Sequence, residues 1–174
     1  GANFINANLI NANFRGANLS GANLSRANLL GANFRGACLR YANLSGTKLS
    51  EVNLTYANFS EAKNVPYIPT SCPEDGEFIA YKKCSLGEIV KLKIPKDAKR
   101  SSATGRKCRC DRAEVISITD KTGKEIDKAR SQYDCSFTYE VGKTVSVPNF
   151  CEDRFDECAE GIHFFINRQE AIDY

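Results

Sequence analysis

The chain contains no methionine and only one histidine among its 174 residues. Because a natural chain starts with methionine, we expect Gly1 to be the first residue of a trimmed or processed piece. The presence of an upstream signal peptide is therefore left as an open alternative. No apolar run approaches the roughly 18 residues of a membrane-spanning helix. The net charge of +3 is too small to indicate a nucleic-acid-binding protein by itself. With 42% hydrophobic and 26% charged residues, the composition excludes a disordered tail and allows one ordinary domain or two small ones.

A five-residue repeat governs the first third of the chain. Leu or Phe recurs at every fifth position from 4 to 59 without a slip, and Ala stands two residues earlier except at Thr47 and Val52. The residue between them is Asn, replaced only by Cys38 and Lys48. A period of five fits neither a helix nor a long strand. It predicts very short extended segments joined by corners, with Ala and Leu or Phe directed inward and Asn outward.

The units ANLSG, ANFRG and ANLLG are similar to the A(D/N)Lxx motif of the pentapeptide-repeat family, and the resemblance covers residues 1–64. It implies a right-handed quadrilateral β-helix with twenty residues per coil, and therefore three coils. Residues twenty apart then form columns, in one of which the rings of Phe14 and Phe34 are expected to stack. The family roles implied are a spacer, a scaffold or a binding surface.

Charge separates this chain from the best-known activity of that family, which is mimicry of duplex DNA to protect DNA gyrase. Mimicry requires a strongly anionic, rod-shaped surface, because duplex DNA carries dense negative charge. Residues 1–64 instead carry six basic side chains against Glu51 and Glu61, with neutral Asn where Asp would supply charge. Three coils are also a short rod. We therefore exclude DNA mimicry.

The repeat decays at residues 62–64 and is followed by Pro66 and Pro69, which lack the backbone donors that strand stacking needs. We therefore divide the chain into a repeat domain, residues 1–66, and a small, mostly-β α+β domain, residues 67–174. Apolar and β-branched runs in the second domain predict several strands and a short terminal helix capped by Asn167. The expected strands are residues 77–84, 89–94, 113–118, 136–139, 144–147 and 162–166.

The segments GEFIAYKKC, KLKIPKDAKRSSATGRKCR and EGIHFFINRQEA resemble an uncharacterised domain found after pentapeptide repeats in phage, viral and bacterial proteins. This resemblance covers nearly all of residues 72–174 and implies no activity. Together with the missing apolar run, it leads us to expect a cytoplasmic location in a bacterium or a phage-infected host.

Seven of the eight cysteines lie in the second domain. Their even number permits disulfides in a secreted protein, but nothing indicates secretion, so we expect free thiols. Cys108, Cys110, Cys158 and His163 offer a zinc set, yet their spacing matches no familiar zinc module, and no metal or cofactor is expected. His163 is interpreted as a hydrogen-bonded structural residue. The alternative is a catalytic base with Cys158 as nucleophile.

The densest basic segment is a predicted loop at residues 99–112, KRSSATGRKCRCDR. Backbone N–H groups in its small polar centre suit a phosphate, although the P-loop motif is absent. The candidate ligand-binding residues are Arg106, Lys107, Arg109, Arg112 and His163. The alternative interpretation is a solvated loop, or one paired inside the protein with the acidic stretch at residues 151–160.

Two classes of function stay open. The first is a non-enzymatic binding or scaffold protein, in which the repeat is a spacer and the second domain caps it and docks a partner, either another protein or a second copy. The alternative is an enzyme or sensor for a phosphorylated or nucleotide ligand, acting through the basic loop 99–112. That alternative requires Arg106, Lys107 and His163 to converge in one concave pocket.

Overall fold

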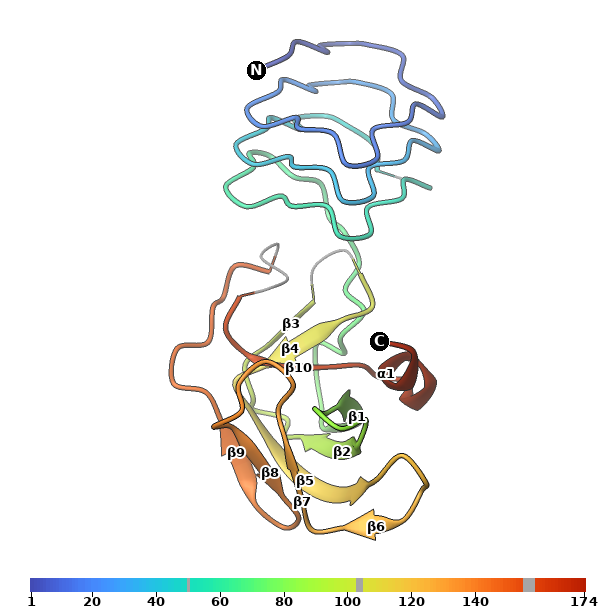
Figure 1. Cartoon of the computed structure of the whole chain (residues 1–174). Helices are drawn as coiled ribbons and strands as arrows, with labels where there is room; N and C mark the ends of the chain where they lie inside the picture. The colour runs from blue at the N-terminus through green and yellow to red at the C-terminus, as the bar shows by residue number, and fades with distance from the viewer. Residues whose placement is uncertain (50, 103–104, 155–158) are drawn as a thin grey trace. The chain divides into compact units, whose positions relative to one another are not determined.

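The computed structural model describes residues 1–49, 51–102, 105–154 and 159–174 (Figure 1). The chain divides into two compact units, each with its own hydrophobic core. The first unit, called the repeat unit here, contains Gly1–Thr70 together with Gly105, Asp153 and Arg154, and the second unit contains Ser71–Ser102, Arg106–Glu152 and Ala159–Tyr174. The fold is mainly β, with one short helix in the described residues. No helix in this part of the chain is long and apolar enough to cross a membrane.

The repeat unit is a stack of coils, coloured blue to green in Figure 1. Parallel bridges join residues twenty apart, from Asn3 and Asn23 to Asn43 and Lys63. Backbone groups bind along the stack, and Leu24 N donates to Asn43 O at 2.9 Å. The bridges confirm the twenty-residue period that the columns require.

Each position of the repeat has a physical role. In all ten units that carry it, the Asn side chain accepts a hydrogen bond from the backbone N–H two residues later, as Asn33 does from Arg35 at 3.1 Å. The inward Leu24 and Leu29 are completely buried. The corner residue is left-handed, with φ of 67° at Gly31, a conformation that glycine adopts without strain.

The inward aromatic column is formed as expected. The rings of Phe14 and Phe34 stack with centroids 4.9 Å apart and planes 26° from parallel. Phe4 meets Phe14 edge-on at 5.9 Å. These offset and edge contacts are the arrangements that aromatic quadrupoles favour.

The second unit contains three antiparallel sheets and the helix α1, Arg168–Asp173. The five-stranded sheet has the order β1-β2-β5-β6, with β9 also paired to β5. Its strands are β1 (Phe78–Lys83), β2 (Ile89–Ile94), β5 (Arg112–Thr119), β6 (Glu125–Ile126) and β9 (Thr144–Ser146). The three-stranded sheet is β10 (Ile162–Phe164), β4 (Cys108–Cys110) and β3 (Arg100–Ser102), and the two-stranded sheet is β7 (Lys128–Arg130) and β8 (Thr138–Glu140).

Strand alternation places the core of the second unit on one face of the five-stranded sheet. Ala80, Val90, Leu92 and Ile118 are fully buried there, while the residues between them are more exposed. Each expected strand has a counterpart in the structure, although most are shorter than expected. Asn167 caps α1 and accepts a hydrogen bond from Gln169 N at 2.8 Å, which confirms the expected cap.

The expectation of one loop at residues 99–112 is wrong. The segment contains β3, β4 and the first residue of β5. The reason is long-range pairing, since β4 lies between β3 and β10. Strands of three residues carry too little periodicity to be recognised in a sequence.

Candidate functional site

The basic segment folds as the hairpin β3–β4. In its register Ser101 faces Arg109, and on the other side of β4 Arg109 faces His163 of β10. The structure therefore brings Arg109 and His163 together across one ladder. Two residues of the candidate phosphate-binding segment, Ala103 and Thr104, lie outside the described residues.

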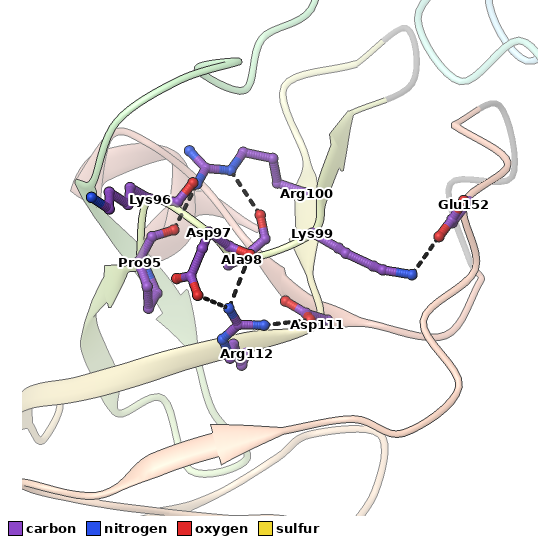
Figure 2. Close-up of polar contacts among 9 residues, drawn as sticks. All are labelled: Pro95, Lys96, Asp97, Ala98, Lys99, Arg100, Asp111, Arg112 and Glu152. Atoms are coloured by element: carbon purple, nitrogen blue, oxygen red, sulfur yellow. Dashed lines mark hydrogen bonds and ion pairs between the residues drawn. The ribbon is translucent and has the colours of Figure 1, made fainter.

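Arg100 and Arg112 clamp the turn that follows β2, as Figure 2 shows. Arg100 donates to the carbonyl groups of Pro95, Lys96 and Ala98 at 2.6, 2.7 and 3.2 Å. Arg112 forms an ion pair with Asp97 at 2.6 Å and donates to Asp97 O at 2.9 Å. Both guanidinium groups thus replace water at backbone and carboxylate oxygens of their own unit, and this use of arginine is structural.

Asp111 adds an anion to the same cluster. Its Oδ2 accepts from Arg112 at 2.9 Å, while its buried Oδ1 has no hydrogen-bond partner in the described structure. Lys99 pairs with Glu152, so one acidic residue of the stretch 151–160 is an internal partner of the basic segment (Figure 2). Two other acidic residues of that stretch, Asp156 and Glu157, lie outside the described residues.

Arg106 and Lys107 both contact residues of the C-terminal segment. Arg106 forms an ion pair with Glu170 of α1, with Nε and Oε1 2.8 Å apart, and this hydrogen bond raises the pKa of the guanidinium. The ammonium group of Lys107 lies 5.7 Å from the ring centre of Tyr174. Arg106 thus has an internal anion, Glu170, in the terminal helix.

Arg109 is only 2% exposed, although it is an arginine in the middle of a basic segment. Its guanidinium lies 5.2 Å from the ring centre of Phe150 and donates to the carbonyl group of Cys151. A buried charge needs such partners, and their loss would leave it uncompensated. The five candidate residues therefore have different neighbours, with Arg106 and Lys107 at the C-terminal segment and Arg112 at Asp97.

Three of the buried thiols, those of Cys84, Cys108 and Cys110, are poor nucleophiles. Burial raises the pKa of Cys84 to about 12 and raises that of Cys110 as well. The pKa of Cys108 is raised by its hydrogen bond with Cys72 and by burial, and the same bond lowers the pKa of Cys72. A thiol held protonated lacks the thiolate that attacks a substrate or binds a metal. Cys158, the nucleophile of the alternative interpretation, lies outside the described residues.

Metal ligands do not gather in the described part of the chain. Among these residues, no group of three or more His, Cys, Asp or Glu side chains lies close enough to hold an ion. The seven described cysteines are free of disulfide bonds to one another.

Lys82 is a buried titratable residue that the motif search missed. It is 7% exposed, and burial lowers its pKa. The sequence FIAYKKC contained a signal for it, because strand alternation places Lys82 on the same face as Ala80 and Cys84. Its methylene stem is apolar, which suits a buried position.

A separate pocket of about 460 Å³ lies on the repeat unit and is lined by Arg26, Ala27, Asn28, Leu30 and Lys48. Lys48 occupies an Asn position and bridges to Asn28 in the neighbouring coil. Leu30 is 42% exposed. Neither Arg26 nor Lys48 forms an ion pair with any residue that the structure describes. The pocket thus combines two uncompensated cations with exposed apolar surface.

Comparisons with known proteins match both parts of the chain. Residues 68–171 match a "Family of unknown function (DUF5758)", and residues 1–36 and 27–63 match "Pentapeptide repeats (8 copies)". No curated protein matches the chain. Among solved structures, a pentapeptide repeat protein from the thylakoid lumen of Arabidopsis thaliana is 30% identical, with a TM-score of 0.19. The match covers 36% of this chain and 43% of that one, so it spans less than half of that protein's length.

Proposed function

Because the chain belongs to the family of unknown function that residues 68–171 match, and carries pentapeptide repeats before it, we propose that it is a non-enzymatic binding or scaffold protein. The repeat array serves as a spacer built as a right-handed quadrilateral β-helix. Four bridge positions in every twenty residues support this architecture. The second unit is the module that docks a partner, and its role as a cap of the array stays a prediction.

The single observation that carries this proposal is the use of the basic segment in folding. Arg100 and Arg112 hold a turn, Arg106 binds Glu170, and Arg109 is buried against Phe150. A phosphate-binding enzyme site needs cations that are exposed and convergent before the ligand arrives. Here each guanidinium would have to break an existing contact first. The thiols of Cys84, Cys108 and Cys110, whose pKa values are raised, also supply no ready nucleophile.

The partner is a protein with an acidic surface, and besides the second unit it also contacts the pocket of the repeat unit. Arg26 and Lys48 line this pocket without internal anions, and Leu30 presents an exposed aliphatic group. Charge complementarity then favours acidic side chains flanking an apolar residue. Such a partner would contact the two cations and the exposed Leu30 side chain, which the fold itself leaves without an internal anion or apolar cover.

A thermal-shift screen of the full chain tests the enzyme or sensor alternative. The panel contains nucleotides, sugar phosphates, zinc and a chelator, and the variants are Arg106→Ala and the control Lys143→Ala. A scaffold predicts that no ligand-dependent shift requires Arg106. A nucleotide-dependent rise in melting temperature that disappears in Arg106→Ala alone would support the enzyme or sensor and contradict the scaffold.

Fluorescence anisotropy tests the partner chemistry. The probe is a labelled peptide of Glu and Leu residues, and the double variant Arg26→Glu with Lys48→Glu is compared with Arg15→Glu, which changes charge outside the pocket. We expect the double variant to lose at least about tenfold in affinity, a free-energy loss of roughly 1.4 kcal/mol. Equal losses in both variants would show that only net charge matters, and the pocket would be rejected.

A further inference from the structure

A second pocket, of about 220 Å³, lies in the second unit on the face of the five-stranded sheet opposite its buried core. It is lined by Tyr81, Ile89, Lys91, Ser117, Thr119 and Arg168. These residues come from β1, β2, β5 and α1. The basic segment contributes none of them, so this pocket is distinct from the site expected from the sequence.

Strand register explains why these side chains meet. Tyr81 faces Lys91 in the β1–β2 ladder, and Lys91 faces Ser117 in the β2–β5 ladder, so the three form one row across the sheet. Ile89 and Thr119 face each other in the next row on the same face. Side chains directly opposite on neighbouring strands lie about 4.5–5.5 Å apart at Cβ. The pocket therefore lies across three neighbouring strands, beside a register shift between Lys91 and Leu92 in the β2–β5 ladder.

Helix α1 supplies the remaining cation. It contacts β1, and Lys83 Nζ of that strand donates to the carbonyl group of Ile172 at 2.8 Å. This contact holds the helix beside the pocket and gives Arg168 its place in the lining. A cation on the helix thus faces the same cavity as a cation on the sheet.

The polar lining consists of hydrogen-bond donors that the fold does not use. In the described residues, the side chains of Tyr81, Lys91, Ser117, Thr119 and Arg168 form no ion pair or hydrogen bond with another residue. No carboxylate lines the cavity. Two like charges and three hydroxyl groups in one pocket attract an anion, and an anion between the cations removes their repulsion.

We propose that this pocket binds a phosphate group, either free phosphate or a phosphate monoester. A tetrahedral dianion offers acceptor oxygens in several directions and matches five donors from four elements, whereas a carboxylate offers two oxygens and one charge. The volume is several times the roughly 30 Å³ of one water and below the roughly 300–1,000 Å³ of pockets for whole drug-sized ligands. The phosphate fills the pocket, and any organic group attached to it projects into solvent.

Isothermal titration calorimetry of the full chain tests this site. The probes are inorganic phosphate, glycerol 3-phosphate, glycerol and acetate, with ionic strength held constant by chloride. We expect binding of both phosphate compounds and none of glycerol or acetate. Tighter binding of glycerol 3-phosphate identifies a monoester, and equal or weaker binding identifies free phosphate as the ligand.

Variants locate the site. Lys91→Gln and Arg168→Gln each remove one cation, and we expect each to weaken phosphate binding by roughly tenfold or more. Tyr81→Phe removes one hydroxyl group and keeps the ring, and its loss is expected to be smaller. The matched control is Lys143→Gln, which removes an exposed cation in the β8–β9 turn and leaves binding unchanged.

The result that overturns the proposal is wild-type affinity in both Lys91→Gln and Arg168→Gln, or acetate binding as tightly as phosphate. Circular dichroism checks that each variant folds. If Lys91→Gln does not fold, the affinity of Arg168→Gln for phosphate tests the proposal instead. Arg168 is exposed, and its replacement disturbs no described contact. Phosphate binding that requires Lys91 but not Arg106 leaves the scaffold proposal intact, so the two proposals can fail separately.

Discussion

Replacing Arg100 with Ala removes a guanidinium that donates to four backbone carbonyl groups, those of Gly76, Pro95, Lys96 and Ala98, at 2.6–3.2 Å. The bonds to Gly76 and Lys96 are exposed, so water can replace the donor there. The bonds to Pro95 and Ala98 are partly buried. A hydrogen bond to a charged group contributes roughly 1.5–3 kcal/mol, so loss of the two partly buried bonds costs about 3–6 kcal/mol.

Arg106→Ala is the matched comparison, because it removes a neighbouring cation from the same basic segment. Its ion pair with Glu170 is exposed, with 61% of the Arg106 side chain accessible. Exposed ion pairs contribute about 0–1 kcal/mol. Arg100→Lys separates charge from shape, since lysine keeps the charge and loses the planar fork that reaches several carbonyl groups. We expect Arg100→Lys to lose most of what Arg100→Ala loses.

Urea unfolding followed by far-UV circular dichroism measures these differences, and hydrogen exchange at residues 96–98 reports the turn directly. The expected order of destabilisation is Arg100→Ala, then Arg100→Lys, then Arg106→Ala. If Arg100→Ala and Arg106→Ala differ by less than about 0.5 kcal/mol, near the limit of additivity between independent sites, the clamp contributes nothing and the reasoning fails.

Three further predictions concern the cores and the repeat. Phe34→Ala deletes a ring that is 1% exposed and should lower the free energy of unfolding by about 3–5 kcal/mol, whereas Phe34→Leu should cost much less; equal costs in urea unfolding would contradict this. Asn33→Ala should cost about 1 kcal/mol by removing the acceptor for Arg35 N, and Asn33→Asp should not; a stable Asn33→Ala in thermal unfolding would remove that role. The raised pKa of Cys84, about 12, keeps the folded thiol protonated while the unfolded thiol ionises near pH 9. Its contribution to stability is complete below pH 9 and lost from there to about pH 12, at about 1.4 kcal/mol per pH unit. Cys84→Ala should flatten this slope in urea unfolding under reducing conditions, and an unchanged slope would refute the assignment.

Local periodicity determined the repeat unit and most of the long strands. Ala and Leu or Phe alternate with Asn at a spacing that leaves one arrangement for a buried interior, so the inward columns and the Phe14–Phe34 stack could be predicted. The same holds for β1 and β2, where five or six residues of alternation identify a strand. Asn167 could be recognised as a cap, because capping uses residues within one turn.

The partners of the basic residues, and the set of side chains that lines the pocket of about 220 Å³, follow only from tertiary contacts. β3 and β4 exist because β10, some fifty residues later, completes their sheet, and the burial of Arg109 against Phe150 follows from that pairing. Lys91 and Arg168 share a pocket only because α1 contacts β1. A sequence records which side chains carry charge and which face of a strand they occupy. Whether a cation finds an internal carbonyl, a carboxylate or an empty cavity depends on contacts between segments far apart in the chain, and these are set by the packing of the whole unit.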